Sequence, residues 1–316
     1  MRILFMGTPE FAVPSLNILV QNNYDICGVV TVPDKKKGRG LNLSYSDVKK
    51  FSMKHSLNIL QPDNLRDPEF IKTLTDLKPD LILVVAFKIL PEEVFTIPKY
   101  GSVNLHASLL PKFRGAAPIN HALINGETES GVTTFFLKKK VDTGNIILQK
   151  KINIDKDDDA GTLHDKLSEL GAESVLETVR LIEAGNVIPQ IQNDSDASSA
   201  PKIFKENCII DWNQNACKIH DFIRGLSPYP AAFTFLNNRS VKIFRSALTG
   251  NSKKETPGSI VVEEKKLLVS CLDNMIEILE LQTEGKKSIP ASEFINGLDK
   301  SVKLFFTNRD DIINNP

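Results

Sequence analysis

Short apolar runs alternate with amphipathic stretches through the first half of the chain. The runs are rich in β-branched residues at consecutive positions and cover residues 2–7, 25–32, 80–87 and 102–108. Strands that are buried on both faces of a parallel sheet have this pattern. Helices are expected in the amphipathic stretches that begin near Pro9, Ser44 and Asp67. The alternation predicts a Rossmann-like, doubly wound α/β domain.

The parallel pattern changes after residue 130. Residues 131–140 and 144–154 read as two strands that only the short turn Val141-Asp142-Thr143-Gly144 joins. A link of this length predicts an antiparallel hairpin, so the sheet is expected to be mixed. A long helix should follow, because apolar residues recur on one face from Leu163 to Ile182.

The composition shifts again near residue 190. Residues 190–206 are polar, contain a proline and have few large apolar side chains, as linkers do. Beyond them, short apolar strands alternate with turn-like segments, which predicts a smaller all-β, OB-like barrel. We therefore expect a first domain over residues 1–189, a linker over 190–206 and a barrel domain over 207–316.

The bulk composition narrows the class of protein. The 316 residues include 39 basic and 39 acidic side chains, so no net field steers the chain to nucleic acid or membrane. No apolar run reaches the roughly 18 residues that a membrane span needs, and no leader segment is expected. The four cysteines are widely spaced, which favours reduced and mostly buried thiols. A cytoplasmic, monomeric protein is expected.

Several common site motifs are missing from the sequence. The first strand runs into Phe5-Met6-Gly7-Thr8-Pro9, with one glycine where a dinucleotide fingerprint has three. Neither a phosphate-binding GxxxxGK[ST] loop nor a GxSxG nucleophile elbow occurs. Without an HExxH motif or a paired Cys/His cluster, no metal is expected.

Two polar residues interrupt the apolar strand at 102–108. Alternation places the side chains of Asn104 and His106 on one face, near the carboxyl end of the strand. Open α/β sheets bind ligands outside the carboxyl ends of their strands. The two residues are therefore either a functional pair or a buried pair that satisfies itself and the backbone.

Asp142, in the turn after the next strand, is the candidate partner of this pair. A carboxylate near His106 would favour the imidazolium form and orient the ring, although Asp is also an ordinary turn residue. The combination of Asn104, His106 and Asp142 suits direct acyl transfer to an amine. The amide would donate to a developing oxyanion, and the imidazole would move the proton.

The motifs around these residues resemble the folate-dependent formyltransferase superfamily. They are Asn104-Leu105-His106, Ser108-Leu109-Leu110-Pro111, Arg114-Gly115-Ala116-Ala117-Pro118 and Val141-Asp142-Thr143-Gly144. The opening Gly7–Phe11, the loop 33–40, and the stretches 210–212 and 285–287 narrow the likeness to members that act on tRNA. The likeness covers nearly the whole chain. One departure is the loop Ala86–Pro91, which is one residue shorter than the family's Ala-Tyr-Gly-x-Ile-Leu-Pro and lacks its glycine.

The resemblance implies a reaction and the residues that serve it. The formyl group of 10-formyltetrahydrofolate would pass to the free amino group of methionyl initiator tRNA, with Asn104, His106 and Asp142 as the catalytic residues. The folate would be bound by the segment that follows the strand, namely Ser108, Leu109, Leu110 and Pro111. The Leu110–Pro111 peptide is expected to be cis. The resemblance also implies that the C-terminal barrel binds tRNA.

A basic loop at residues 34–40 is the candidate tRNA contact. From composition alone it is either a solvated loop or a phosphate-binding one. The resemblance favours the second interpretation, with Lys35, Lys36, Lys37 and Arg39 as the binding residues.

Other functions remain open at this stage. The same chemistry could serve a UDP-amino sugar or glycinamide ribonucleotide as acceptor, or water in a folate deformylase. A non-catalytic tRNA-binding protein that keeps the fold is a further alternative.

Overall fold

The structure is a computed structural model that describes residues 1–37, 42–250, 252, 255–298 and 304–307. Its packing divides the chain into two compact units. Unit 1 comprises Met1–Pro118, Glu129–Asn153 and His164–Ala200; unit 2 comprises Ile119–Thr128, Ile154–Leu163 and Pro201–Pro316. The main boundary lies at Ala200, within the segment predicted as a linker, and two short segments from the first half of the chain belong to unit 2.

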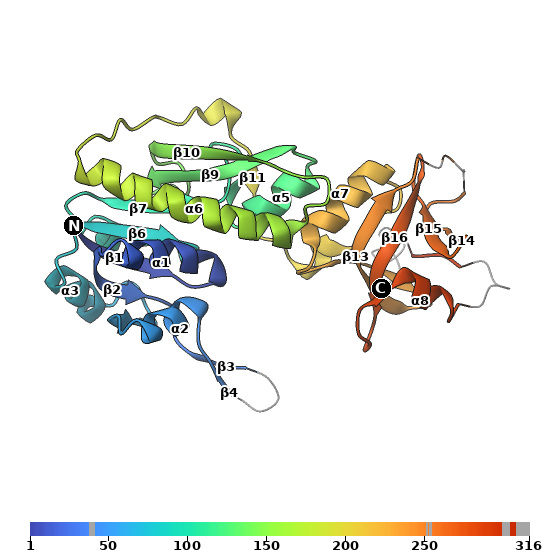
Figure 1. The fold of residues 1–316 in the computed structure, drawn as a ribbon, viewed down its shortest axis with the longest axis horizontal. Helices are drawn as coiled ribbons and strands as arrows, with labels where there is room; N and C mark the ends of the chain where they lie inside the picture. Colours follow the sequence, from blue (N-terminus) through green and yellow to red (C-terminus); the bar gives the residue numbers. More distant parts are fainter. Residues whose placement is uncertain (38–41, 251, 253–254, 299–303, 308–316) are drawn as a thin grey trace. The chain divides into compact units, whose positions relative to one another are not determined.

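Unit 1 is built on a seven-stranded sheet with the order β10-β9-β7-β6-β1-β2-β5 (Figure 1). The strands are β1 (Arg2–Gly7), β2 (Asp25–Val30), β5 (Ile59–Leu60), β6 (Leu81–Val85), β7 (Ser102–His106), β9 (Glu129–Phe136) and β10 (Ile146–Asn153). The strands from β5 to β7 in this order are parallel, whereas β9 is antiparallel to both β7 and β10. The predicted mixed, Rossmann-like sheet is confirmed.

Helices lie in the three connections where the sequence predicts them and in the long segment after β10, whereas the short helices α4 (Glu92–Phe95) and α5 (Pro118–Ile124) were not predicted. The predicted helices are α1 (Val13–Gln21), preceded by a 3-10 turn η1 (Glu10–Ala12), α2 (Asp47–Lys54), α3 (Pro68–Asp76) and α6 (Ala160–Glu183). The side chains of Ser46 and Asp67 cap α2 and α3 by accepting backbone N–H groups of the first turn. These local signals explain why the two helices begin where the sequence predicts.

The two faces of the sheet near β7 have different covers. On one face α6 packs against the sheet: Leu105 of β7 approaches Gly171, and Thr134 of β9 hydrogen-bonds Thr178 at 2.7 Å (Figure 1). The other face near the centre of the sheet packs against α3 and α4 through buried residues such as Leu4, Met6, Ile82, Val84, Phe70, Leu74 and Val94. Alternation along β7 turns Asn104 and His106 away from α6.

Short strands complete unit 1. The hairpin β3 (Lys35–Lys37) and β4 (Asn42–Ser44) forms the start of the predicted basic loop. The parallel pair β8 (Arg114–Gly115) and β11 (Ser199–Ala200) joins the chain after β7 to the segment before unit 2, next to the turn η2 (Asp194–Asp196). Much of the segment predicted as a linker therefore packs on unit 1.

Unit 2 is built on an antiparallel sheet with the order β12-β13-β16-β15-β14. Its strands are β12 (Ala232–Leu236), β13 (Arg239–Leu248), β14 (Ile260–Glu263), β15 (Lys266–Ser270), β16 (Met275–Thr283) and β17 (Ile289–Pro290), the last paired with β16. Residues 304–307 bridge Phe235 of β12 and Ser259 beside β14, which closes the sheet on itself. The predicted OB-like barrel is confirmed, with η3 (Lys205–Cys208), α7 (Ala216–Leu226) and α8 (Ala291–Ile295) around it.

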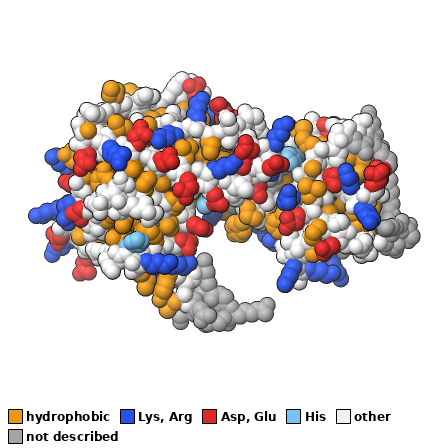
Figure 2. Space-filling view, viewed as in Figure 1, with side chains coloured by type: hydrophobic (Ala, Val, Ile, Leu, Met, Phe, Trp, Pro, Cys, Tyr) orange, Lys and Arg blue, Asp and Glu red, His pale blue; other side chains and the backbone are white. Residues whose placement is uncertain are grey.

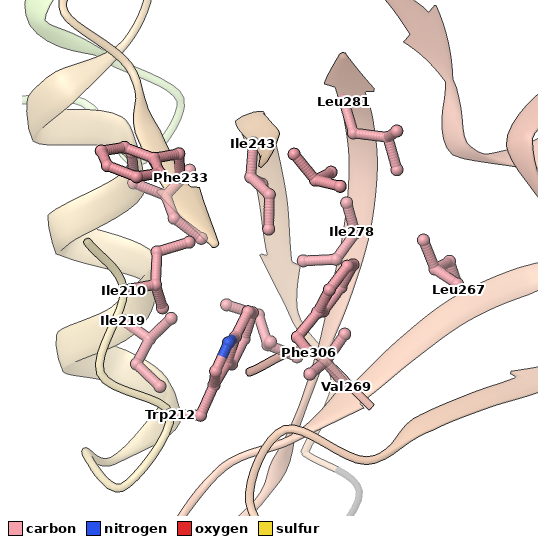
Figure 3. Close-up of a cluster of buried hydrophobic side chains, with 14 of the residues drawn as sticks. Ile210, Trp212, Ile219, Phe233, Ile243, Leu267, Val269, Ile278, Leu281 and Phe306 are labelled. Carbon is pink, nitrogen blue, oxygen red and sulfur yellow. The ribbon is translucent and has the colours of Figure 1, made fainter. Parts of the chain in front are cut away.

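One continuous apolar cluster fills unit 2. Trp212 is fully buried and stacks on Phe306, with ring centroids 5.6 Å apart and an interplanar angle of 11° (Figure 3). Its indole N–H donates to Thr234 Oγ1 at 3.2 Å. Since Phe306 belongs to the segment that closes the barrel, Trp212 supports that closure from inside.

The cysteines agree with the prediction of reduced and mostly buried thiols. Cys27, Cys208 and Cys271 are buried free thiols, whereas Cys217 is exposed on α7. Burial raises the pKa of the three buried thiols, that of Cys271 to about 12. They behave as core residues rather than as reactive groups.

Replacing Trp212 should measure the contribution of this core. We expect Trp212→Ala to lower the free energy of unfolding by about 3–5 kcal/mol, because it leaves a large cavity and removes the partner of Phe306. Trp212→Phe, which keeps a ring to stack, should cost clearly less. Urea unfolding followed by far-UV circular dichroism measures both changes, and equal losses in the two variants would contradict this role.

Candidate active site

The candidate site lies on the face of β7 that α6 does not cover. Asn104 and His106 share this face with Phe135 and Thr133, which lie opposite them on β9. His106 ends β7 and is buried, whereas Asn104 is partly exposed. Within the described residues the Asn104 side-chain amide has no hydrogen-bond partner, so it is available to a ligand.

Both ring nitrogens of His106 have defined surroundings. Nε2 lies 2.8 Å from the carbonyl oxygen of Phe113, and Nδ1 lies 3.8 Å from Oδ2 of Asp142. A carbonyl oxygen can only accept, so Nε2 carries a hydrogen in this arrangement. Nδ1 is therefore the acceptor nitrogen of the neutral ring, and it faces the Asp142 carboxylate.

Asp142 is held through its side chain and its backbone. Its Oδ2 accepts the Gly115 N–H at 2.9 Å, and its carbonyl oxygen accepts Gln192 Nε2 at 3.0 Å. Its φ of +54° lies in the left-handed region, which Asp tolerates better than most residues. Residues 137–145 connect β9 to β10, a longer link than the predicted turn at 141–144. The structure thus brings all three predicted catalytic residues to one face of the sheet or its covering loop.

Two glycines allow the backbone to pack closely around Asp142. A Cβ on Gly144 would lie 1.5 Å from the Phe136 carbonyl oxygen. Gly115 has φ +127°, and a Cβ there would lie 2.5 Å from the Ala200 carbonyl oxygen. Only glycine fits either position, so the motifs at 114–118 and 141–144 have a steric basis.

Side chains from β9 and β10 shape the loop that follows β7. Thr133 Oγ1 donates to the Ser108 carbonyl oxygen at 2.6 Å and accepts the Leu110 N–H at 3.1 Å. Gln149 Nε2 donates to the Leu110 carbonyl oxygen at 2.8 Å. The Leu110–Pro111 peptide is cis, as predicted.

The predicted folate-binding residues differ in what they can offer a ligand. Ser108 and Leu110 are buried, and Ser108 Oγ donates to the Lys112 carbonyl oxygen at 2.6 Å. The backbone hydrogen bonds of Leu110 are already taken by Thr133 and Gln149. Leu109 and Pro111 are partly exposed, so they are the members of this set with surface for an incoming molecule.

The predicted basic loop begins at Asp34, whose side chain is held by two hydrogen-bond donors. Asp34 receives hydrogen bonds from Lys49 Nζ at 2.6 Å and from Gln61 Nε2 at 2.8 Å. These bonds, with that of Lys49 the larger effect, hold the pKa of the Asp34 carboxyl below its usual range. Lys35 is exposed; only the backbone is described for Lys36 and Lys37, and Arg39 lies outside the described residues.

Sequence reasoning missed three residues that build the site. Phe113 supplies the carbonyl for His106, and Ser198 Oγ accepts the Phe113 N–H at 2.9 Å. Gln192 is buried and bonds the turn that carries Asp142. The first carries no polar side chain, and the other two lie in a stretch whose composition resembles a linker, so no sequence pattern marks them.

Neither the surface charges nor any metal-binding cluster of the described residues adds a residue to this site. Acidic and basic side chains are interspersed over the face shown in Figure 2. Among the residues that the structure describes, no group of three or more His, Cys, Asp or Glu side chains is arranged to hold a metal ion. No helix in the described ranges combines the length and apolar character needed to cross a membrane.

The sequence matches two models of a known enzyme family. Residues 1–179 match the formyl transferase family model, and residues 202–299 match the model of the formyl transferase C-terminal domain. The chain belongs to the formyl transferase family.

Named relatives agree with this assignment, and solved structures share the fold. A methionyl-tRNA formyltransferase from Caldanaerobacter subterraneus is 48% identical over 94% of this chain and 97% of its own length. The fold resembles that of a methionyl-tRNA formyltransferase from Clostridium thermocellum, with a TM-score of 0.55, 18% identity, and coverage of 79% of this chain and 94% of that one. It also resembles a sugar 3N-formyl transferase solved in the presence of dTDP and 5-N-formyl-THF, with a TM-score of 0.68, 22% identity, and coverage of 91% and 99%.

The steric role of Gly144 can be tested directly. Gly144→Ala should lower the free energy of unfolding by roughly 1–3 kcal/mol, because the new Cβ overlaps the Phe136 carbonyl and the turn must move. Gly297→Ala is the control, since among the residues that the structure describes its new Cβ would meet only the Phe294 carbonyl oxygen, at 3.7 Å. Equal urea unfolding midpoints for the two variants would contradict the close approach at Gly144.

Proposed function

We propose that the protein transfers the formyl group of 10-formyltetrahydrofolate to the free amino group of methionyl initiator tRNA. The observation that carries the proposal is the pairing of His106 with Asp142 beside the unengaged amide of Asn104. Membership of the formyl transferase family supports the chemistry, and the 48% identical relative named methionyl-tRNA formyltransferase supports the acceptor.

The reaction moves one proton and exchanges one bond. The amine lone pair of the acceptor attacks the formyl carbon, and the carbonyl oxygen becomes an oxyanion. The bond between the formyl carbon and N10 of the folate then breaks. The amine loses a proton and N10 gains one, so the products are the formylated amine and tetrahydrofolate.

Asn104 is suited to stabilise the oxyanion. Its amide N–H₂ can donate, and it is not committed to another group in the described part of the chain. A donor that is already in position stabilises charge without having to reorganise during the reaction. In this proposal, the formyl oxygen lies against the Asn104 amide.

His106 is suited to carry the proton. With Nε2 bound to the Phe113 carbonyl, Nδ1 accepts the proton from the attacking amine and returns it to N10. At 3.8 Å Asp142 is too far for a direct hydrogen bond to the ring, so in this proposal its negative charge offsets the positive charge of the ring during proton transfer. The carboxylate thus supports the step in which His106 holds the proton.

The folate is placed beside the loop after β7 in this proposal. Leu109 and Pro111 would contact it with apolar surface, whereas Ser108 and Leu110 would act by fixing the loop. An open hollow of about 300 Å³, lined by residues 63–66 and 88–91, lies at the loops that follow β5 and β6. This hollow includes the loop that departs from the family pattern, and it offers space for part of the donor.

The tRNA is bound through phosphate contacts in this proposal. Lys35, Lys36, Lys37 and Arg39 would contact the acceptor stem, and unit 2 would hold another part of the tRNA. Such contacts carry little sequence information but position the substrate. The anchored Asp34 would fix where the basic hairpin begins.

Catalysis by the three site residues is testable by substitution. Asn104→Ala should reduce kcat on the order of 100- to 1,000-fold by removing an oxyanion donor. His106→Ala and Asp142→Ala should fold and also turn over very slowly, since proton transfer contributes roughly 100- to 10,000-fold. The measurement is transfer of labelled formyl to methionyl-tRNA, with His55→Ala as a surface histidine control. Wild-type turnover in any site variant would remove that residue from the mechanism.

The acceptor can be identified in the same assay. Offered charged initiator tRNA, an amino sugar nucleotide or water alone, the protein should formylate only the tRNA, and less so as salt rises. Lys35→Ala should raise KM for tRNA and leave KM for the folate unchanged, whereas Lys72→Ala, an exposed lysine of α3, should change neither. Formate release without formylated tRNA would instead indicate a deformylase.

A further inference from the structure

One buried amide lies at the centre of the polar contacts around Asp142. Gln192 is 8% exposed, although it lies outside any helix or strand, in the polar stretch predicted as a linker. Buried amides are costly unless their hydrogen bonds are made. The contacts of Gln192 therefore need an explanation beyond the linker role that its neighbours suggest.

All hydrogen-bonding positions of the Gln192 amide are occupied. Nε2 donates to the carbonyl oxygens of Asp142 at 3.0 Å and Gly144 at 2.7 Å. Oε1 accepts from Nε and Nη2 of Arg114 at 3.1 and 2.7 Å. An amide has two donor hydrogens and two acceptor lone pairs, so this environment also fixes which end of the amide is nitrogen.

These bonds clamp the turn that carries Asp142. Gln192 hydrogen-bonds the backbone carbonyls on both sides of Thr143, and the Asp142 carboxylate accepts the Gly115 N–H. Arg114, next to Gly115, is held by Gln192 and by an ion pair with Asp194 at 2.7 Å. The Arg114 hydrogen bond holds the pKa of Asp194 below its usual range. Gln192 and Asp194, which belong to one segment, thus hold both the turn that carries Asp142 and the residue next to Gly115.

The same segment also supports His106. Ser198 Oγ accepts the Phe113 N–H at 2.9 Å, and the Ser198 carbonyl accepts the Arg114 N–H at 2.9 Å. Phe113 in turn provides the carbonyl for His106 Nε2. Residues 192–200 therefore contact the supports of both His106 and Asp142 through separate side chains.

We propose that Gln192 is a positioning residue that sets the location of the Asp142 carboxylate relative to His106, by clamping the turn 142–144 to Arg114. The proposal rests on the proposed function for its kinetic consequence. It predicts a loss in the chemical step rather than in substrate binding, because Gln192 faces the backbone and Arg114 instead of a substrate.

Gln192→Glu is the sharpest test. The near-isosteric carboxylate keeps two acceptor oxygens for Arg114 but cannot donate to the carbonyls of Asp142 and Gly144. We expect kcat to fall on the order of 100-fold, as for a catalytic group displaced by about 1 Å, with KM unchanged for both substrates. Gln192→Met, which adds no charge, should show the same pattern. Gln190→Glu, on an exposed residue of the same segment, should behave as wild type.

A double-mutant cycle separates positioning from general stability. If Gln192 acts through Asp142, Gln192→Met should cost little further activity in an Asp142→Ala background. Multiplicative losses in the double variant, or unchanged kcat in both single variants, would overturn the proposal.

A second measurement does not depend on activity. Exchange of the Gly115 amide hydrogen should accelerate on the order of 10-fold in Gln192→Glu and Gln192→Met, because the carboxylate that protects it moves. If wild-type protein transfers no formyl group, the proposed function fails, and this exchange still decides whether Gln192 positions Asp142. Unchanged exchange in both variants would refute the clamp.

Discussion

Buried backbone groups need hydrogen-bond partners, and this constraint governs the half of unit 1 that carries the candidate site. On the α6 face a helix satisfies its own backbone. On the opposite face, coil segments cover β7 and β9, so side chains must supply the missing partners. Thr133, Gln149, Gln192 and Ser198 do this for the loops around His106 and Asp142. The site thereby gains fixed geometry from irregular backbone.

The residues of the candidate site are positioned in two different ways. Asn104 and His106 project from a strand, so the sheet sets their spacing and direction. Asp142 lies in the long connection between β9 and β10. It is held by the close packing that Gly144 allows, by the Gly115 N–H that its carboxylate accepts, and by the buried Gln192 amide that donates to its carbonyl oxygen. The Asp142 carboxylate is therefore the least locally determined part of the site. Its position depends on residues some 50 positions away in the sequence.

The sequence predicted the elements whose signals are local. Apolar runs located the parallel strands, alternation placed Asn104 and His106 on one face, and the turn-rich C-terminal half indicated a barrel. The pattern could not locate Gln192 or Ser198, because a side chain that bonds distant backbone has no periodicity. Low apolar content made residues 190–206 resemble a solvated linker. In the structure the side chains of Ser198 and Gln192 form hydrogen bonds with backbone groups of unit 1, so the polar composition of this segment does not mean that it lacks contacts. The closing segment 304–307 of the barrel was missed for a similar reason, since its pairing depends on partners far away in the sequence.

Unit 2 does not consist of a continuous piece of chain. It includes Ile119–Thr128 and Ile154–Leu163, where Asn120 donates to the Gly225 carbonyl and Ile124 packs against Gly225. A gene fragment that starts after residue 200 would encode the barrel strands but omit these pieces of its packing. The two units therefore cannot be exchanged with other proteins by a single crossover. During synthesis, the early pieces of unit 2 leave the ribosome long before α7, on which they pack, and before the strands of the barrel, so the folding of unit 2 must wait for nearly the whole chain.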